Sequence, residues 1–182
     1  MNTKQHSKTV EMVYIALFSV IITICSWISI PFAVPFTLQT FAIFAALGLL
    51  GGKRGTLSVI VWLLLGAIGI PVFSGFTGGL GVLFGSTGGY ILGFVLIGII
   101  YSIITYFFGT KVPIMILAML IGLFVCYTFG TVWFILIYTK SKGAIGVITA
   151  LSWCVFPFII PDFFKMALAI LLTKRLSCYI EL

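Results

Sequence analysis

Long apolar runs alternate with short clusters of charged residues, prolines and glycines along almost the whole chain. A helix that crosses a membrane needs about 20 apolar residues, and several of these runs approach that length. The first run is too long for the apolar part of a signal peptide, and no small-residue cleavage site follows it, so we interpret it as a retained helix. The pattern predicts an all-α membrane protein with six transmembrane helices, at residues 10–30, 37–50, 56–70, 90–108, 113–138 and 158–174.

The last apolar region is too long for one upright helix. Residues 143–173 would extend over about 46 Å as a helix, whereas the apolar core of a membrane is about 30 Å thick. Pro157 and Pro161 lie inside the region, and proline interrupts a helix interior. We therefore predict a short interfacial segment at residues 144–155, followed by a sixth helix that carries Pro161 in its first turn, where proline is tolerated.

The composition indicates a lipid environment for the whole chain. Of the 182 residues, 62% are hydrophobic and only 7% are charged, against about 25% charged in soluble domains. We expect a single membrane domain over residues 1–182, with no soluble catalytic or nucleic-acid-binding domain. The net charge of +7 does not indicate nucleic acid, because the basic residues are scattered in ones and twos, and such residues suit the anionic lipid of a bilayer.

The positive charges predict how the helices are oriented in the membrane. With six helices both chain ends lie on one side, and cytoplasmic loops are enriched in Lys and Arg. Lys140 and Lys142 fall on the side opposite to seven other flanking cations, which are Lys4, Lys8, Lys53, Arg54, Lys111, Lys174 and Arg175. We therefore expect both ends inside the cell and the uncharged residues 71–89, between helices 3 and 4, outside.

Two charges stand inside an apolar run, at Asp162 and Lys165. A charge that faced lipid at the membrane centre would cost several kcal/mol, so both must face the bundle interior or a water-filled pocket. Their i, i+3 spacing places both side chains on one face of a helix. Two interpretations follow: the pair lines a ligand cavity, or it is structural, either as an internal ion pair that fixes packing or with Asp162 capping its helix.

Residues 71–89 are rich in glycine and aromatic residues and carry no charge. They lack the GK[ST] of a P-loop, and Phe84 stands where a GxGxxG run needs its third glycine. Irregular backbone at membrane depth requires cover from protein or a cavity. We therefore predict a loop folded over the outer mouth of the bundle, with close helix packing as the alternative use of its glycines. Thr37, Gln39 and Tyr90 begin helices at the same level and would add polar anchors to an apolar pocket.

Several segments resemble those of a known family. They are residues 50–55 (LGGKRG), 66–73 (GAIGIPVF), 78–80 (GGL), 85–90 (GSTGGY) and 157–165 (PFIIPDFFK), and they are similar to the BioY family, the biotin-specific substrate-binding (S) components of energy-coupling factor (ECF) transporters. The resemblance covers nearly the whole chain. It implies a six-helix membrane protein that captures biotin from outside, and a partner module made of a transmembrane coupling protein and two ATPases.

The resemblance also implies roles for individual residues. The family's acid–lysine signature falls on Asp162 and Lys165, and its glycine-rich loop and tyrosine fall on Gly79 and Tyr90. From side-chain chemistry rather than from the family's motif, we expect Asp162 to accept hydrogen bonds from the ureido N–H groups of biotin, and Lys165 to neutralise Asp162 and donate to the ureido oxygen. Gln39 and Tyr90 would complete the polar set, and aromatic residues of the loop would cover the thioether ring.

The first helix carries the expected docking surface. S components often have an Ala-x-x-x-Ala motif there, at the face that packs on the coupling protein. In this chain Ala16 and Val20 occupy that spacing, with valine in place of the second alanine. Small residues favour close contact between membrane helices, so the resemblance implies docking through this face.

Other functions remain open from the sequence. The acid–lysine pair could hold another vitamin in a related S component, or the chain could be a self-sufficient small-solute carrier or channel, although carriers often contain inverted repeats and none is evident here. A membrane enzyme is disfavoured, because no second carboxylate accompanies Asp162 and the only histidine, His6, lies in the polar tail. No Cys-x-x-Cys pair is present, so we expect neither a metal site nor a disulfide framework, and no cofactor other than biotin as the transported ligand.

Overall fold

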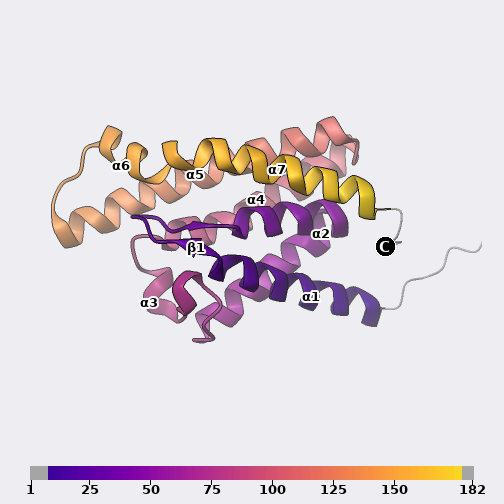
Figure 1. Cartoon of the computed structure of the whole chain (residues 1–182), viewed down its shortest axis with the longest axis horizontal. Coiled ribbons are helices and arrows are strands. Elements are labelled where there is room, and N and C mark those ends of the chain that lie inside the picture. Colours follow the sequence, from indigo (N-terminus) through magenta and orange to yellow (C-terminus); the bar gives the residue numbers. More distant parts are fainter. Residues whose placement is uncertain (1–7, 178–182) are drawn as a thin grey trace, which may run out of the picture.

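Figure 1 shows the computed structural model, a bundle of long helices that run roughly along one direction. The structure describes residues 8–177. Within that range, five helical stretches are long and apolar enough to cross a membrane. Two residues discussed above, Lys4 and His6, lie outside it.

The first helix, α1 (Lys8–Trp27), ends before the predicted boundary at residue 30. Pro31 follows closely, and a residue that precedes proline is driven out of the helical region. The chain instead forms a small antiparallel pair of strands, β1 (Ser29–Ile30) and β2 (Phe36–Thr37). The all-α prediction misses this hairpin, because two-residue strands leave no periodic pattern in the sequence.

The helix α2 (Gln39–Ala67) contains both the second and the third predicted helices. Its interruption is a single residue, Gly51, with φ 77° and ψ 171°, a conformation that glycine adopts without a steric penalty. The chain turns back there (Figure 1), and a Cβ placed on Gly55 would lie only 2.8 Å from Leu47 Cα. The gap predicted between residues 50 and 56 is therefore almost entirely helical.

Residues 71–89 fold back onto α2. They contain a 3₁₀ turn, η1 (Ser74–Phe76), and a one-turn helix, α3 (Leu80–Leu83). Trp62 of α2 donates its indole N–H to Val72 O at 3.1 Å. Gly66 leaves room for the Phe73 ring, which would lie 2.0 Å from a Cβ at that position. The glycine-rich stretch is therefore closely packed rather than extended.

The next two helices are α4 (Gly88–Phe108) and α5 (Val112–Lys142), and they pack against each other along their lengths. α5 continues past the predicted end at residue 138, so Lys140 and Lys142 lie in its last turn. Its 31 residues extend over about 46 Å, which exceeds the apolar core of a bilayer and matches its full thickness with the headgroups included.

The last region is split as predicted into a short helix and a long one. The short helix is α6 (Val147–Cys154), and the long one is α7 (Phe156–Leu176). α7 begins two residues earlier than expected, with Pro157 in its first turn and Pro161 inside the helix. The break at Val155, where φ is −125°, allows α6 and α7 to follow different directions.

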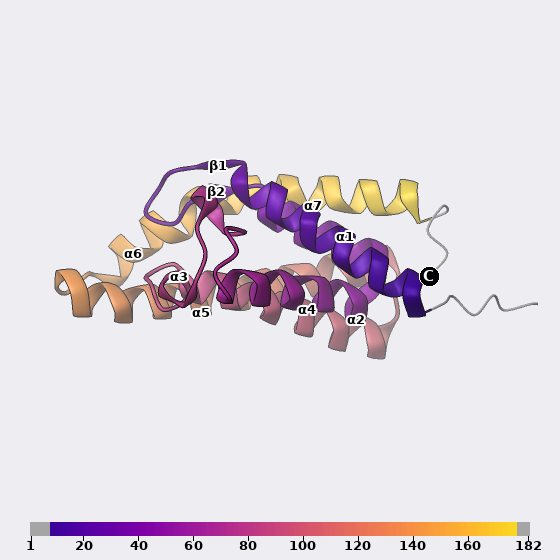
Figure 2. The same cartoon turned by 90° about the horizontal axis from the view of Figure 1, so that it is seen from below.

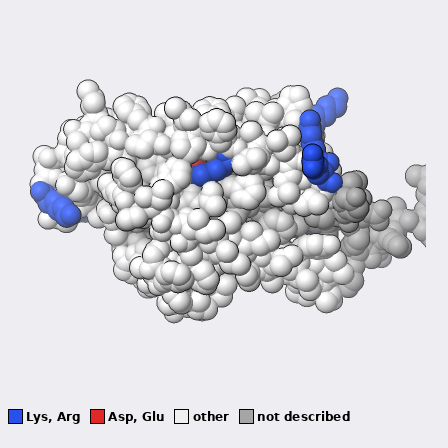
Figure 3. Space-filling model, viewed as in Figure 1, with Lys and Arg blue, Asp and Glu red and all other residues white. Residues whose placement is uncertain are grey.

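The helix α2 occupies the centre of the bundle. It contacts α1, α4 and α7, and 61% of its most apolar stretch is buried, against 28–39% in the other candidate spans. In Figure 2, α1 and α7 lie on one side of the bundle and α4 and α5 on the other. On the face shown in Figure 3, Lys and Arg side chains gather at the two ends of the molecule. One further charged spot lies in a recess near the middle.

Candidate functional site

Asp162 and Lys165 form an ion pair inside the bundle. Lys165 Nζ lies 2.8 Å from Asp162 Oδ1, and Lys165 and Asp162 are only 6% and 2% exposed. Both side chains come from one face of α7, as their i, i+3 spacing predicts. Ions taken out of water need further hydrogen bonds to offset the cost of desolvation, and the surrounding residues supply them.

The ammonium group of Lys165 has all three of its hydrogens engaged. Besides Asp162, it donates to Thr37 O at 2.7 Å and to Thr40 Oγ1 at 3.1 Å. The ring of Phe36 lies 4.4 Å from Nζ, within range of a cation–π contact. The β1–β2 hairpin and the first turn of α2 therefore enclose the cation.

The carboxylate of Asp162 accepts hydrogen bonds at both oxygens. Thr40 Oγ1 donates to Oδ1 at 2.8 Å, beside Lys165, and the hydroxyl of Tyr127 donates to Oδ2 at 2.5 Å. An ionised carboxylate has about four acceptor sites. Three are used here, so Asp162 retains capacity for one further donor.

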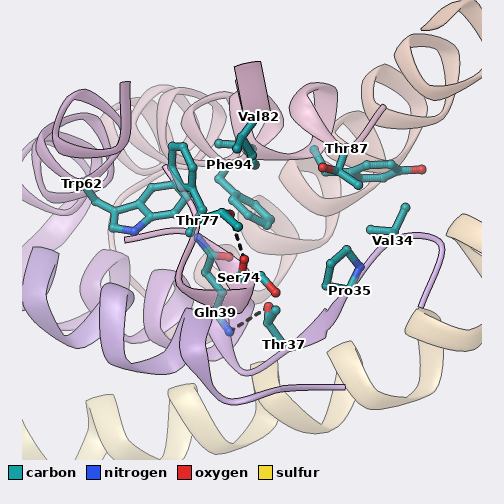
Figure 4. A pocket seen from close by; sticks show the side chains of 13 residues that line it. Val34, Pro35, Thr37, Gln39, Trp62, Ser74, Thr77, Val82, Thr87 and Phe94 are labelled. Atoms are coloured by element: carbon teal, nitrogen blue, oxygen red, sulfur yellow. Dashed lines mark hydrogen bonds between the residues drawn. The ribbon is translucent and has the colours of Figure 1, made fainter. Parts of the chain in front are cut away.

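An apolar cavity of about 290 Å³ lies beside this network, close to the lower limit for small-molecule sites. Its walls come from α2, α4, residues 34–37 and residues 73–87 (Figure 4). A smaller recess reaches Asp162 and Lys165, and it shares with the cavity the residues Val34, Pro35, Thr37, Tyr90 and Phe94. The ion pair therefore stands at the polar end of a mostly apolar pocket.

Gln39 lines the cavity, and its amide nitrogen is unpaired. Figure 4 shows its side chain between Trp62 and Thr37, while its backbone N–H bonds Thr37 Oγ1 at 3.3 Å. The residue is 4% exposed, and Nε2 has no hydrogen-bond partner among residues 8–177. A buried donor left without a partner costs about 1–3 kcal/mol, so this amide is available to a ligand acceptor.

Tyr90 lines both the cavity and the recess with its ring. Its hydroxyl lies 2.8 Å from Thr131 Oγ1 of α5, and the residue is 6% exposed. Gly130 makes this position possible, because a Cβ there would come within 2.4 Å of the ring. Tyr90 therefore forms part of the pocket wall, with its hydroxyl already engaged.

The remaining sequence-predicted residues lie apart from this pocket. Gly79 precedes α3 with φ 94°, its N–H bonds Gly66 O at 2.7 Å, and it is not among the residues that line the cavity. Ala16 and Val20 are exposed on the outer face of α1. The structure thus brings together Asp162, Lys165, Gln39 and Tyr90, but not Gly79.

Sequence reasoning missed Thr40 and Tyr127. Thr40 contacts both members of the ion pair, and Tyr127 contacts Asp162 from α5. A signal did exist for α5, because Tyr127 and Thr131 are polar residues at i, i+4 spacing in an apolar helix and so share one face. Thr40 gave no such signal, since threonine is common in membrane helices.

The arrangement suits binding rather than catalysis. The pocket combines apolar walls with one acceptor at Asp162, one donor at Gln39 and a fully hydrogen-bonded lysine. Among residues 8–177, no group of three or more His, Cys, Asp or Glu side chains could hold a metal ion. A small molecule with an apolar body and both N–H and C=O groups fits this chemistry.

Comparisons with known proteins agree with this description. The sequence profile of the BioY family matches residues 1–181. The chain is 37% identical over 172 residues to a probable biotin transporter BioY of Pyrococcus horikoshii, covering 93% of this chain and 98% of that protein. It is 35% identical over 175 residues to the biotin transporter BioY of Thermotoga maritima, covering 92% and 95%.

A solved structure shares the fold. It is the crystal structure at 2.1 Å of the S-component for biotin from an ECF-type ABC transporter. The TM-score is 0.80 with 29% sequence identity, and the match covers 97% of this chain and 94% of the other. The likeness therefore extends over the whole bundle rather than one helical hairpin.

Proposed function

The chain belongs to the BioY family, and from this we propose that it is the biotin-binding S component of an ECF-type transporter. It is a multi-pass membrane protein of a family of transporter components, not an enzyme. The observation that carries the proposal is the buried Asp162–Lys165 pair at the polar end of an apolar cavity. Such a site supplies polar contacts to the head of a ligand while its apolar walls hold the rest.

The ureido head of biotin would lie against the ion pair. Asp162 has acceptor capacity left for one ureido N–H, because three of its roughly four acceptor sites are in use. Lys165 can reach the ureido oxygen only by releasing an acceptor that it now holds. Thr40 Oγ1, at 3.1 Å, is the longest of its three contacts, so we expect that contact to be exchanged on binding.

The apolar part of biotin would occupy the larger cavity. Trp62, Phe73 and Phe94 line it and supply aromatic surface for the thioether ring. The unpaired Nε2 of Gln39 would donate to an oxygen of the ligand. Tyr90 would act as a wall, and Gly79 would act through the conformation of the loop, since it does not line the cavity.

We further propose six membrane crossings, with both chain ends in the cytoplasm. Five continuous helical stretches among the described residues are apolar enough to cross a membrane. Gly51 divides one of them, α2, into two helices, which supports six crossings. The starts of α1 and α5, the turn at Gly51 and the end of α7 lie at one end of the bundle in Figure 1. These positions carry most of the flanking Lys and Arg residues, and the positive-inside rule places them in the cytoplasm. The pocket would then open outward under residues 71–89.

Energy for uptake would come from a partner module. The sequence contains no P-loop, so we propose that the chain works with a transmembrane coupling protein and two ATPase subunits. The exposed outer face of α1, with Ala16 and Val20, is the proposed docking surface. A lipid-exposed face with a small residue lets another membrane helix approach closely.

Biotin titration of the purified full chain by isothermal titration calorimetry tests this function. We expect saturable binding of biotin and no competition from a panel of other vitamins. Absence of heat and of thermal stabilisation by biotin would refute the proposal. Binding of another vitamin with higher affinity than biotin would assign the chain to an S component of different specificity.

A further inference from the structure

A second, larger cavity adjoins the proposed biotin pocket, and Leu123 and Tyr127 line both this cavity and the recess that reaches Asp162. It is a groove of about 550 Å³ between α5 and the α6–α7 pair. Its lining includes Phe124, Val132, Leu151 and Phe163. Phe124, Val132 and Phe163 are each more than half exposed, so the groove opens sideways to the surroundings of the bundle.

The groove exposes almost no polar surface. Three hydroxyl residues line it, Tyr127, Thr128 and Thr131, and each already has a partner. Tyr127 donates to Asp162, Thr128 donates to Phe124 O at 2.9 Å, and the Thr131 hydroxyl pairs with that of Tyr90. A polar occupant would lose hydrogen bonds to water and regain few from the groove. The groove therefore suits a hydrocarbon chain.

The position of the groove along α5 places it inside the membrane. Its α5 lining runs from Leu120 to Ile135, a rise of about 22 Å. The remaining turns at each end of α5 lead to Lys111 on one side and Lys142 on the other. The groove thus lies within the depth of the acyl chains, where lipid rather than a soluble partner is the neighbour.

Two unpaired cations stand beyond one end of the groove. Lys142 follows Ile135 by seven residues, or two helical turns, and so lies on the same face of α5. Its Nζ is 5.7 Å from the Tyr138 ring, one turn nearer the groove. Among residues 8–177 the only carboxylates are Glu11 and Asp162, which pair with Arg54 and Lys165. Lys140 and Lys142 therefore lack an anionic partner within the described chain.

We propose that this groove binds a phospholipid with an anionic headgroup. One acyl chain lies between α5 and the α6–α7 pair, and the phosphate contacts Lys142 and Lys140 at the membrane surface. A lysine ammonium group forms charge-assisted hydrogen bonds with phosphate oxygens on either side of a membrane, and the apolar groove holds the acyl chain without contributing to headgroup selection. Tyr127 lines the groove and also donates a hydrogen bond to Asp162. An acyl chain bound in the groove therefore also restrains Tyr127 and, through it, the position of Asp162 in the ligand pocket.

The test is lipid binding by the full-length protein in detergent, measured by native mass spectrometry. Phosphatidylglycerol and phosphatidylcholine with identical acyl chains serve as probes. We expect phosphatidylglycerol to bind more tightly by roughly tenfold, and K140Q/K142Q to abolish that preference. K111Q, at the other end of α5, is the matched control and should keep it.

A second pair of variants tests the groove itself. V132W places a large ring in the groove, whereas L136W changes an equally exposed residue of α5 outside it. We expect V132W to lose both lipids and L136W to bind them as the wild type does. Equal binding by V132W and L136W, or equal affinity of the wild type for both lipids, overturns the proposal. A wild-type dimer that V132W dissociates and L136W preserves also overturns it, because a second chain would then fill the groove.

Discussion

Tyr127 donates its hydroxyl hydrogen to Asp162 Oδ2 across 2.5 Å, from a helix 35 residues earlier in the chain. This bond joins α5 to α7, which otherwise make few direct contacts. It also fixes the orientation of the Asp162 carboxylate plane, because Thr40 and Lys165 bind the other carboxylate oxygen. Residues of three helices, α2, α5 and α7, therefore orient the carboxylate that would accept from the ligand.

Loss of the Tyr127 hydroxyl should weaken ligand binding. In Y127F, Asp162 Oδ2 loses its donor, and a hydrogen bond to a charged group contributes about 1.5–3 kcal/mol. We expect biotin affinity to fall by roughly tenfold or more, measured by calorimetry. Y138F, on the same helix but away from the ion pair, is the control and should bind normally. Unchanged affinity in Y127F would mean that the bond has no part in positioning Asp162.

Replacement of Gln39 should change stability and binding in opposite directions. The unpaired Nε2 is a cost to the empty protein, so Q39M should melt at the same temperature as the wild type or higher. Biotin affinity should fall about three- to tenfold, as expected for one lost hydrogen bond. A lower melting temperature with unchanged affinity would show that Gln39 serves the fold instead.

The ion pair should behave as a coupled unit in stability. Removal of one partner from a buried pair leaves an uncompensated charge and costs about 3–5 kcal/mol. We expect K165M alone to lower the melting temperature more than D162N/K165M, which removes both charges. Both should fail to bind biotin. Additive losses in the double variant would contradict a direct interaction between the two charges.

Much of this fold follows from the apolar runs and their interruptions. The run length placed the long helices, and the two charges inside one run correctly implied burial of Asp162 and Lys165. A break between residues 50 and 56 is predicted from the sequence, but its restriction to Gly51 is not, because the neighbouring Gly52 is also glycine and is helical. Thr40 and Tyr127 were missed because their contacts join positions 122 and 35 residues away from Asp162.

The reversal at Gly51 can be tested by adding a methyl group. Its φ of 77° disfavours any residue with a Cβ, although no atom lies within 4 Å of one. G51A should therefore lose about 1–3 kcal/mol of stability from backbone strain alone. G81A, at an exposed position without positive φ and with no atom within 4 Å of an added Cβ, is the control and should not melt below the wild type. Equal melting temperatures for G51A and the wild type would place the reversal elsewhere.

The outer face of α1 should matter for transport but not for ligand binding. A16W adds bulk to the proposed docking surface far from the pocket, so biotin affinity should be unchanged. Copurification with the coupling protein and ATPases should be lost, whereas L168W, on the exposed face of α7, should copurify normally. Retained assembly in A16W would move the docking surface to another helix. Biotin flux into liposomes that contain only this chain would contradict dependence on the module.

The central claim is that the buried carboxylate of Asp162 receives biotin, and one titration tests it most directly. Biotin is titrated into the wild type, D162N and E11Q, where Glu11 is the other described carboxylate and pairs with Arg54 away from the pocket. We predict wild-type affinity for E11Q and at least a tenfold loss for D162N, because an uncharged amide replaces an ionised acceptor. Biotin binding by D162N as tight as that of the wild type would contradict the claim.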